Sequence, residues 1–272
     1  MSAQNPEAAI DSGLSIGRDR AFWRSVAEEV SAGVREATLL HEKINRQTWR
    51  VWVDGQLSVI VKFWRRPGIR GTVSRLARVN TSYREWRALR LLSGSGLLSP
   101  CPLGYFRLRS PAVRHDEALV SEDLGECRDA TAHVKHLLAA NDFDALVRFE
   151  NELVSITKRM IEIRLIDTDH RISNFVVTPE GRIARLDLEH AVHVTCLKLS
   201  AQRYGIMLGG LVGTYVFAVQ PDVVHAVSFA QCLAEQLSPP RRVLCHARKE
   251  VRRLLDGQYR FAGIASRIEL SW

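Results

Sequence analysis

Two aspartates and one asparagine near the middle of the 272-residue chain have a spacing suited to phosphoryl transfer. Asn174 follows Asp169 by five residues, and Asp187 follows Asn174 by thirteen. Phosphoryl transfer needs a base for the acceptor hydroxyl, and oxygen or amide ligands that hold magnesium where the nucleotide phosphates end. A loop with Asp169 and Asn174, followed by a hairpin that returns Asp187 beside them, would supply all three groups.

The residues between Asn174 and Asp187 predict that hairpin. Phe175–Val177 is a short apolar run, Thr178–Arg182 is rich in turn-forming residues, and Ile183–Leu188 is typical of a second strand. An aspartate and an asparagine at this spacing also occur by chance in loops. The hairpin and the third residue together favour the functional interpretation.

A single lysine interrupts an apolar strand earlier in the chain. The segment from Thr48 to Val53 and the segment from Leu57 to Trp64 flank the turn Asp54-Gly55, which predicts a β-hairpin. The second strand contains the sequence VIVK, ending at Lys62, which is close to the third-strand pattern of protein kinases. Lys62 either contacts nucleotide phosphates from this strand or is a solvated residue at a sheet edge.

A helix predicted over Tyr83–Leu92 contains the candidate partner of that lysine. Its apolar residues Trp86, Leu89 and Leu92 have helical spacing, and Glu85 lies beside this stripe. Glu85 can pair with Lys62, or it can be one more exposed charge on an arginine-rich helix.

An apolar strand that breaks into an acidic, glycine-terminated segment follows at Ala118–Gly125, after a turn at Gly96–Pro100. Such a segment is typical of a hinge between two lobes, and its backbone around Glu122 to Leu124 would face an adenine edge. The alternative is an ordinary strand end.

The order of these motifs resembles the lipopolysaccharide core kinase family, the Kdo and heptose kinases, within the protein-kinase-like superfamily. The motifs are VIVK, REWRALRLL, LVSEDLG, DTDHRISNFVV and RLDLEHA, and they lie between Thr48 and His193. The resemblance implies an α+β, two-lobed kinase-like fold with a β-rich N-lobe and an abbreviated helical C-lobe. We expect a loose leader over residues 1–20, the N-lobe over 21–124 and the C-lobe over 125–272.

The resemblance also implies the roles of individual residues. ATP and Mg²⁺ would be the cofactors, and a lipid-linked core sugar would be the acceptor. The residues carried over by position are Lys62 as the phosphate-binding lysine, Glu85 as its helix partner, Asp169 as the catalytic base, and Asn174 and Asp187 as metal ligands. Glu122 and Leu124 are expected at the adenine from the hinge pattern of their segment.

Three departures from the kinase pattern leave alternatives open. The stretch Leu40–Thr48, where a glycine-rich phosphate loop would lie, contains no glycine. Asp167 stands where many kinases have histidine, which adds a second candidate base, and Leu188 stands where many have phenylalanine. A small-molecule phosphotransferase of the aminoglycoside type and a non-catalytic pseudokinase module are therefore alternative functions.

Composition and charge restrict the partners and the compartment. Five widely spaced cysteines without a CxxC pair suggest reduced thiols in a cytoplasm. A net charge of +8 favours an anionic partner, and eight arginines lie between Arg65 and Arg90. We expect this segment to contact a glycolipid head group or the inner membrane surface, with a second basic run at 241–253. No sequence motif supports nucleic-acid binding.

Two helices are predicted for the second half. The apolar positions between Asp144 and Ile166 step by three and four residues, which predicts an amphipathic helix leading into the catalytic loop. The stretch Gly205–Val219 is too short for a typical membrane span of about 20 residues, which favours a buried helix. Its glycines Gly205, Gly209 and Gly213 would let another helix pack closely.

Overall fold

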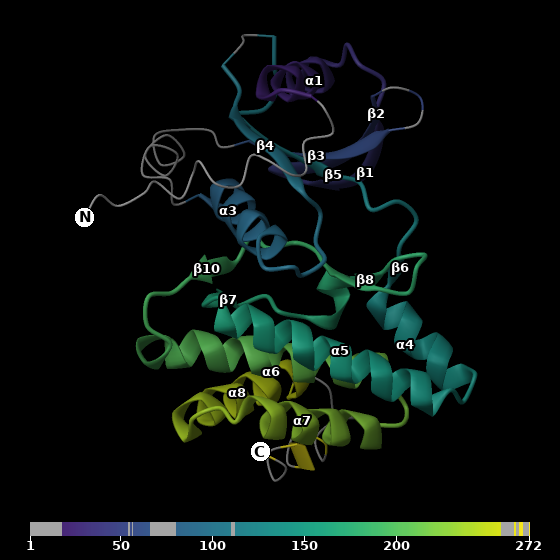
Figure 1. Ribbon diagram of the computed structural model, residues 1–272, viewed down its shortest axis with the longest axis vertical. Coiled ribbons are helices and arrows are strands. Elements are labelled where there is room, and N and C mark those ends of the chain that lie inside the picture. Colours follow the sequence, from purple (N-terminus) through teal and green to yellow (C-terminus); the bar gives the residue numbers. More distant parts are fainter. Residues whose placement is uncertain are drawn as a thin grey trace. The chain divides into compact units, whose positions relative to one another are not determined.

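A computed structural model describes residues 18–53, 55, 57–65, 80–109, 112–256, 264, 267, 268 and 272. The chain divides into two compact units, with the boundary between Gly125 and Glu126. The first unit contains a sheet with helices, and the second consists mainly of helices (Figure 1). The predicted leader up to Gly17 lies outside the described residues, and Arg20, which we assigned to it, begins helix α1.

The first unit is built on a five-stranded antiparallel sheet in the order β1-β2-β3-β5-β4. Its elements are α1 (Arg20–Ala32), β1 (Thr38–Lys43), β2 (Arg46–Trp52), β3 (Ser58–Trp64), α3 (Thr81–Ser93), β4 (Pro102–Arg107) and β5 (Glu117–Glu122). The predicted hairpin is confirmed as β2 and β3, with Thr48 opposite Lys62. Lys62 is in a central strand of this sheet, because β3 has β2 on one side and β5 on the other.

The glycine-free stretch at Leu40–Thr48 is itself a hairpin, formed by β1 and β2 around a short turn after Lys43. Every residue of β1 is exposed. A strand that buries no side chain has no alternation of apolar and polar residues, which explains why the residue pattern did not predict it.

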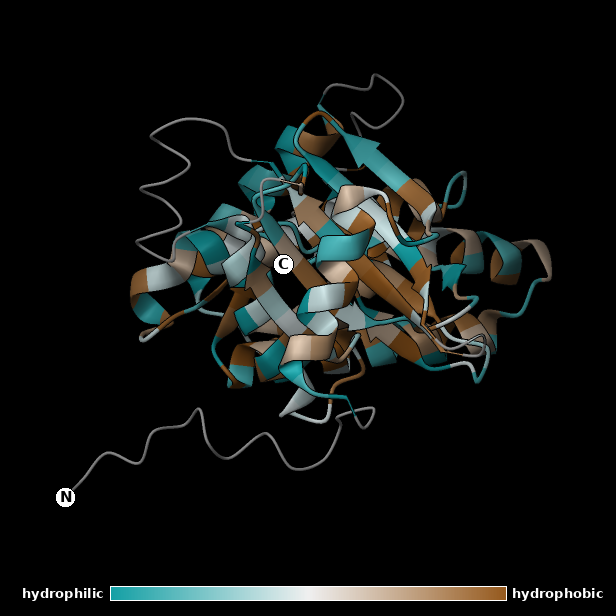
Figure 2. Cartoon of the chain, turned by 90° about the horizontal axis from the view of Figure 1, so that it is seen from above, coloured by the Kyte–Doolittle hydropathy of each residue, from teal (hydrophilic) through white to brown (hydrophobic). Residues whose placement is uncertain are grey.

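Helix α1 packs its buried residues into the hydrophobic core of this unit. Asp19 caps the helix by accepting a hydrogen bond from the amide of Phe22, and Gly33 ends it in a left-handed conformation. The core joins the helix to the sheet through Trp23, Val26, Ala27, Val30, Val51, Val59, Val61, Phe63, Phe106, Ala118 and Val120. In Figure 2 brown, hydrophobic strands lie beside teal, hydrophilic ones.

The second unit combines helices with short strands. Its elements are β6 (Arg128–Asp129), α4 (Ala130–Ala139), α5 (Phe143–Glu162), β7 (Leu165–Asp167), the 3₁₀ helix η1 (Ile172–Asn174), β8 (Phe175–Val177), β9 (Ile183–Arg185), β10 (Ala191–His193), the 3₁₀ helix η2 (Lys198–Ser200), α6 (Ala201–Ala218), α7 (Val224–Leu237) and α8 (Arg241–Leu255). Strands β6, β8 and β9 form one small sheet, and β7 pairs with β10.

The predicted amphipathic helix is confirmed as α5, but the prediction of its end is wrong. The helix stops at Glu162, and Arg164 turns the chain with a left-handed φ of 59°. Leu165 and Ile166 then form β7, which pairs antiparallel with β10. Apolar spacing alone does not separate a last helical turn from a short buried strand, which is why we extended the helix too far.

The hairpin predicted between Asn174 and Asp187 is confirmed as β8 and β9, with Phe175 opposite Arg185. The second strand ends at Arg185, three residues earlier than predicted, because the backbone of Asp187 is left-handed with a φ of 51°. Asp187 therefore lies in a loop beyond the strand.

Helix α6 is the predicted buried helix, and its glycines allow α8 to pack against it. A Cβ atom added at Gly209 would lie 2.4 Å from the carbonyl oxygen of Ala247, and one at Gly205 would lie 2.6 Å from that of Val243. The backbones of the two helices are thus too close for a larger side chain. Among the described helices, none is both long and apolar enough to cross a membrane.

We predict that Gly209→Ala lowers the free energy of unfolding by about 2 kcal/mol, the usual cost of overpacking, despite the better helix propensity of alanine. Gly213→Ala is the matched control, because its added Cβ would meet the flexible end of Leu254 at 2.8 Å instead of backbone. Urea unfolding of both variants decides this. Equal stabilities for the two would contradict close helix packing as the reason for the glycines.

A carboxyl group is buried between α5 and α6. Glu150 is 8% exposed and accepts a hydrogen bond from the hydroxyl of Tyr215. Burial raises the pKa of Glu150 to about 7, and the hydrogen bond from Tyr215 opposes that rise. The group is therefore more easily protonated in the folded chain than in the unfolded chain.

Because the pKa is raised by folding, protonation of Glu150 favours the fold. This stabilisation is complete below pH 4.5 and is lost as the pH rises to about 7, by an amount on the order of 3 kcal/mol. We predict that Glu150→Gln gains stability relative to the wild type across that pH window, measured by chemical unfolding. Glu162→Gln, at an exposed position of the same helix, should track the wild type. A constant difference between Glu150→Gln and the wild type at all pH values would refute the prediction.

Candidate active site

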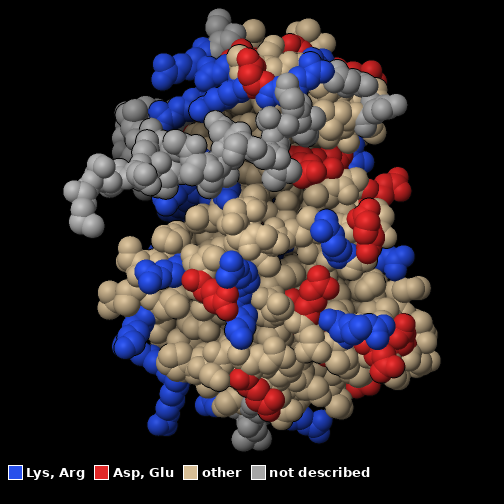
Figure 3. Space-filling view, in the orientation of Figure 1, with Lys and Arg blue, Asp and Glu red and all other residues tan. Residues whose placement is uncertain are grey.

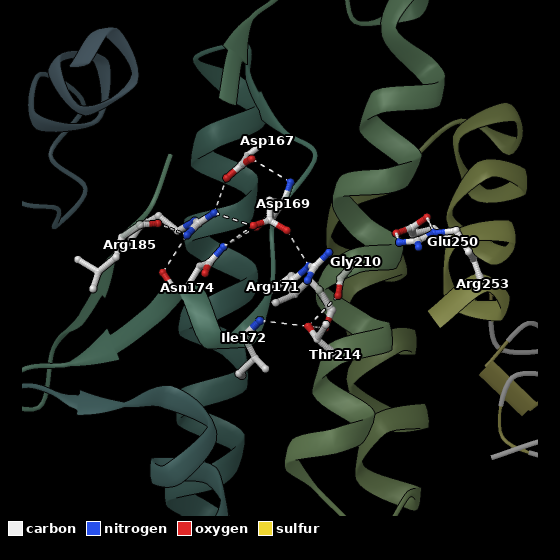
Figure 4. Close-up of polar contacts among 12 residues, drawn as sticks. Asp167, Asp169, Arg171, Ile172, Asn174, Arg185, Gly210, Thr214, Glu250 and Arg253 are labelled. Carbon is white, nitrogen blue, oxygen red and sulfur yellow. Dashed lines mark hydrogen bonds and ion pairs between the residues drawn. The ribbon is translucent and has the colours of Figure 1, made fainter. Parts of the chain in front are cut away.

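The loop between β7 and β8 brings the first two predicted site residues into contact (Figure 4). The side-chain amide of Asn174 donates to the backbone oxygen of Asp169 at 2.7 Å and to its carboxylate at 3.3 Å. Asn174 is the last residue of η1, so the 3₁₀ turn makes the five-residue spacing close in space. Since the amide nitrogen faces Asp169, the amide oxygen of Asn174 points elsewhere and is suited to bind a cation.

Asp169 is the solvent-accessible aspartate of this loop. Its carboxylate is 28% exposed and lies 2.7 Å from Nε of Arg171, which is itself 43% exposed. An exposed carboxylate on a loop fixed by Asn174 can accept a proton from a hydroxyl group that approaches from solvent.

Asp167, the second candidate base in the sequence, has a different environment. Its side chain is fully buried, forms an ion pair with Arg185, and accepts the amide of Asp169 at 2.9 Å. Burial raises the pKa of Asp167, while Arg185 and the amide of Asp169 stabilise its carboxylate and oppose that rise. A carboxylate without solvent access cannot meet a substrate hydroxyl, so the geometry favours Asp169 as the base.

Arg185 is a residue of this site that the residue pattern did not predict. Its side chain has no exposed surface, and its guanidinium donates to Asp167 and to the backbone oxygens of Asp169, Asn174 and Leu186. The ring of Phe175 lies below it, 5.1 Å from Cζ. The available signal was an arginine within the apolar strand sequence Ile183-Ala184-Arg185-Leu186, the same kind of interruption that drew attention to Lys62.

Asp187 and Glu189 place two further carboxylates in the same unit, and these could serve as oxygen ligands. The amide of Leu186 donates to the backbone oxygen of Asn174 at 2.9 Å, which holds the start of this segment to η1. Carboxylate oxygens of Asp187 and Glu189 lie within 4.8 Å of each other. A left-handed φ at a non-glycine residue costs about 1 kcal/mol, and such residues are typical of functional sites. Carboxylate and amide oxygens are the ligands that Mg²⁺ prefers, so Asn174 and Asp187 fit this metal.

Helices α5 and α6 each form a hydrogen bond that supports this loop. His170 is fully buried, and its Nε2 lies 3.0 Å from the hydroxyl of Thr157 on α5. Burial lowers the pKa of His170 well below its usual range, so the imidazole is neutral. On the other side, the amide of Ile172 donates to the hydroxyl of Thr214 on α6 at 3.1 Å. The loop is therefore fixed to α5 and α6 by neutral hydrogen bonds.

Lys62 and Glu85 meet in the first unit, and the predicted contact is confirmed. The Nζ atom of Lys62 lies 2.5 Å from Oε1 of Glu85, and the two side chains are 17% and 2% exposed. Glu85 is on the buried face of α3 with Leu89 and Leu92, so it is not a solvated helix charge. An ion pair this deeply placed fixes the direction of the lysine chain.

A buried polar cluster anchors α3, which contains Glu85, to the sheet. The carboxylate of Glu117 at the start of β5 accepts hydrogen bonds from Asn80, Ser82 and Tyr105. Asn80 is the N-cap position of α3 and Ser82 lies in its first turn. These bonds hold the start of the helix at a fixed position along β5.

The predicted adenine segment follows β5 and is fixed by its own side chains. The amide of Glu122 donates to the backbone oxygen of Cys101, and its carboxylate lies 3.3 Å from the amide of Cys101. Asp123 pairs with Arg50 at 2.6 Å and accepts the amide of Gly125 at 3.0 Å. Leu124, between Asp123 and Gly125 in the chain, is partly exposed. The side chain of Glu122 is therefore engaged with Cys101, the residue before β4, and any role of this segment at adenine would use its backbone.

The chain has a protein-kinase-like fold, as predicted: a β-rich N-terminal part whose central strand holds a lysine, and a helical C-terminal part that contains the β8–β9 hairpin. Among solved structures, WaaP in complex with acyl carrier protein aligns with a TM-score of 0.60 and 17% sequence identity, over 86% of this chain and 96% of the WaaP chain. This similarity establishes the fold and agrees with the resemblance to the lipopolysaccharide core kinases. No protein-family model matches the chain, and no curated protein matches it in sequence.

Proposed function

We propose that this protein is an ATP-dependent kinase that phosphorylates a sugar hydroxyl of the lipopolysaccharide inner core. The observation that carries the proposal is the contact between Asp169 and Asn174 on a solvent-accessible loop. The same unit holds Asp187 directly after the hairpin, and the fold is that of a kinase.

In this proposal each residue acts through the geometry described above. Asp169 orients the acceptor hydroxyl and takes its proton, while Asn174 and Asp187 hold magnesium. Mg²⁺, when bound, neutralises charge on the nucleotide phosphates. Lys62 binds those phosphates and Glu85 keeps its ammonium group in place. The backbone of Glu122 to Leu124 contacts adenine.

The acceptor class is supported by the motifs and by the structural neighbour. The motif order of this chain resembles the lipopolysaccharide core kinases, and the fold comparison with WaaP agrees with that resemblance. The formal net charge of +8 suits an anionic glycolipid acceptor.

Transfer of labelled phosphate from ATP, with Mg²⁺, to a panel of acceptors tests the proposal. We expect transfer to lipid-linked Kdo or heptose. Transfer to free aminoglycosides alone would favour a small-molecule phosphotransferase, and the absence of both transfer and ATP binding would favour a pseudokinase module.

We predict that Asp169→Asn lowers turnover by roughly a hundredfold or more, as expected for the loss of a general base, and leaves nucleotide affinity nearly unchanged. Steady-state phosphate transfer and nucleotide titration measure the two effects. Glu162→Gln, which removes an exposed carboxylate of α5, should behave as the wild type. Full turnover in Asp169→Asn would remove Asp169 from the role of base.

For a lipid-linked acceptor we further propose a peripheral position on the cytoplasmic side of the inner membrane. Of the eight arginines between Arg65 and Arg90, four lie outside the described residues, namely Arg66, Arg70, Arg75 and Arg78. The second basic run, at 241–253, lies within the described residues and is part of helix α8. Its exposed side chains are Arg241, Arg242, Lys249, Arg252 and Arg253. In Figure 3 basic side chains project from the lower left edge, the part of the view in which Figure 1 draws α8.

Helix α8 has the pattern of an electrostatic contact surface. Its apolar residues Val243, Ala247 and Val251 are buried, and its exposed face contains no large apolar side chain that could insert into lipid. A cationic face of this kind suits the flat, anionic surface of a bilayer, where each basic residue contributes about 1 kcal/mol.

We predict that replacing Arg241, Arg242 and Lys249 by glutamine weakens binding to vesicles containing anionic lipid by about a hundredfold at low salt, and less as salt increases. Co-sedimentation across a salt series measures this. The matched control replaces Lys135, Arg148 and Lys158, which are exposed on α4 and α5, and removes the same charge. An equal loss of vesicle binding in both triple variants would contradict a membrane role for α8. The same conclusion would follow if the wild-type protein did not bind anionic vesicles at any salt concentration.

A further inference from the structure

One guanidinium group connects every segment of the candidate catalytic loop. Nη2 of Arg185 contacts the carboxylate of Asp167 and lies 3.3 Å from the backbone oxygen of Asp169. Its Nη1 donates to the backbone oxygens of Asn174, at 2.8 Å, and Leu186. The end of β7, the loop, η1 and the segment leading to Asp187 thus share one donor (Figure 4).

We infer that Arg185 is a positioning residue that sets the spacing between the base Asp169 and the metal ligands Asn174 and Asp187. The consequence for catalysis rests on the proposed kinase function. Arg185 is fully buried, so it touches neither substrate nor nucleotide and acts only through the backbone of the residues that do.

The chemistry of the contacts requires arginine. A planar guanidinium presents five N–H donors in a fixed fork and can reach a carboxylate and several backbone oxygens at once. A lysine ammonium is a compact charge on a flexible chain and cannot span acceptors on both sides of the loop. The loop geometry therefore depends on the shape of this group as well as on its charge.

Stability alone does not account for this arrangement. A buried ion pair can often be replaced by neutral or apolar residues without loss of stability, although removal of one partner is strongly destabilising. Neutral replacements for Arg185 and Asp167 could fill the space, but they would leave the backbone oxygens of Asp169, Asn174 and Leu186 without their common donor. A structural role and a positioning role therefore predict different results for a paired replacement.

The test is the double variant Asp167→Asn/Arg185→Met, examined by amide hydrogen exchange and thermal unfolding. It removes both charges together, and the introduced carboxamide keeps an oxygen that can accept the amide of Asp169. We expect a folded protein whose amides in residues 167–176 and 185–189 exchange at least tenfold faster, while those of α6 and α8 keep wild-type rates. Arg185→Lys, which keeps the charge and loses the fork, should show the same faster exchange. It also serves as the deciding variant if the double variant does not fold.

Catalytic measurements separate this inference from the proposed function. With an active wild type, both variants should lose at least a hundredfold in kcat, with KM for ATP changed less than threefold. Wild-type exchange in the two segments of a folded variant would overturn the inference whatever the activity. Wild-type protein that transfers no phosphate would refute the kinase proposal, and the exchange rates would still decide whether Arg185 holds the loop.

Discussion

The buried contact between Arg185 and Asp167 is the interaction on which the candidate site depends. An unpaired charge in this position would be costly, so each residue requires the other. Their contact also fixes the backbone from which Asp169 and Asn174 project. The exposed groups of the loop can therefore remain accessible to solvent without being free to move, because a buried neighbour determines their separation.

The first unit uses a similar arrangement at Lys62. The lysine lies in a central strand, its partner Glu85 lies on the buried face of α3, and the start of α3 is held by hydrogen bonds to Glu117. In both units a charged residue within an apolar strand is matched by a buried carboxylate. Such charges are expensive to bury without a partner, and they occur where chemistry requires a fixed direction for a side chain.

The sequence predicted the fold class, both hairpins, α3, α5 and the glycine-mediated packing of α6, because each has a strong periodic or turn signal. The contact between Lys62 and Glu85 was also predictable, since a lone charge in an apolar strand suggests a partner. Strand β1 was not predictable from the sequence, because all its residues are exposed. The end of α5 was not predictable either, because apolar residues continue from the helix into the next strand. Arg185 was missed because its partners are mainly backbone oxygens, which no residue pattern records.

The measurement that tests the central claim most directly is a crystal structure with Mg²⁺ and a non-hydrolysable ATP analogue. We predict a metal ion about 2.1 Å from the amide oxygen of Asn174 and from a carboxylate oxygen of Asp187, with the nucleotide phosphates at Lys62 and the carboxylate of Asp169 left open to an acceptor. A metal ion bound without Asn174 and Asp187, or a nucleotide bound away from Lys62, would contradict the assignment of this loop as a phosphotransfer site.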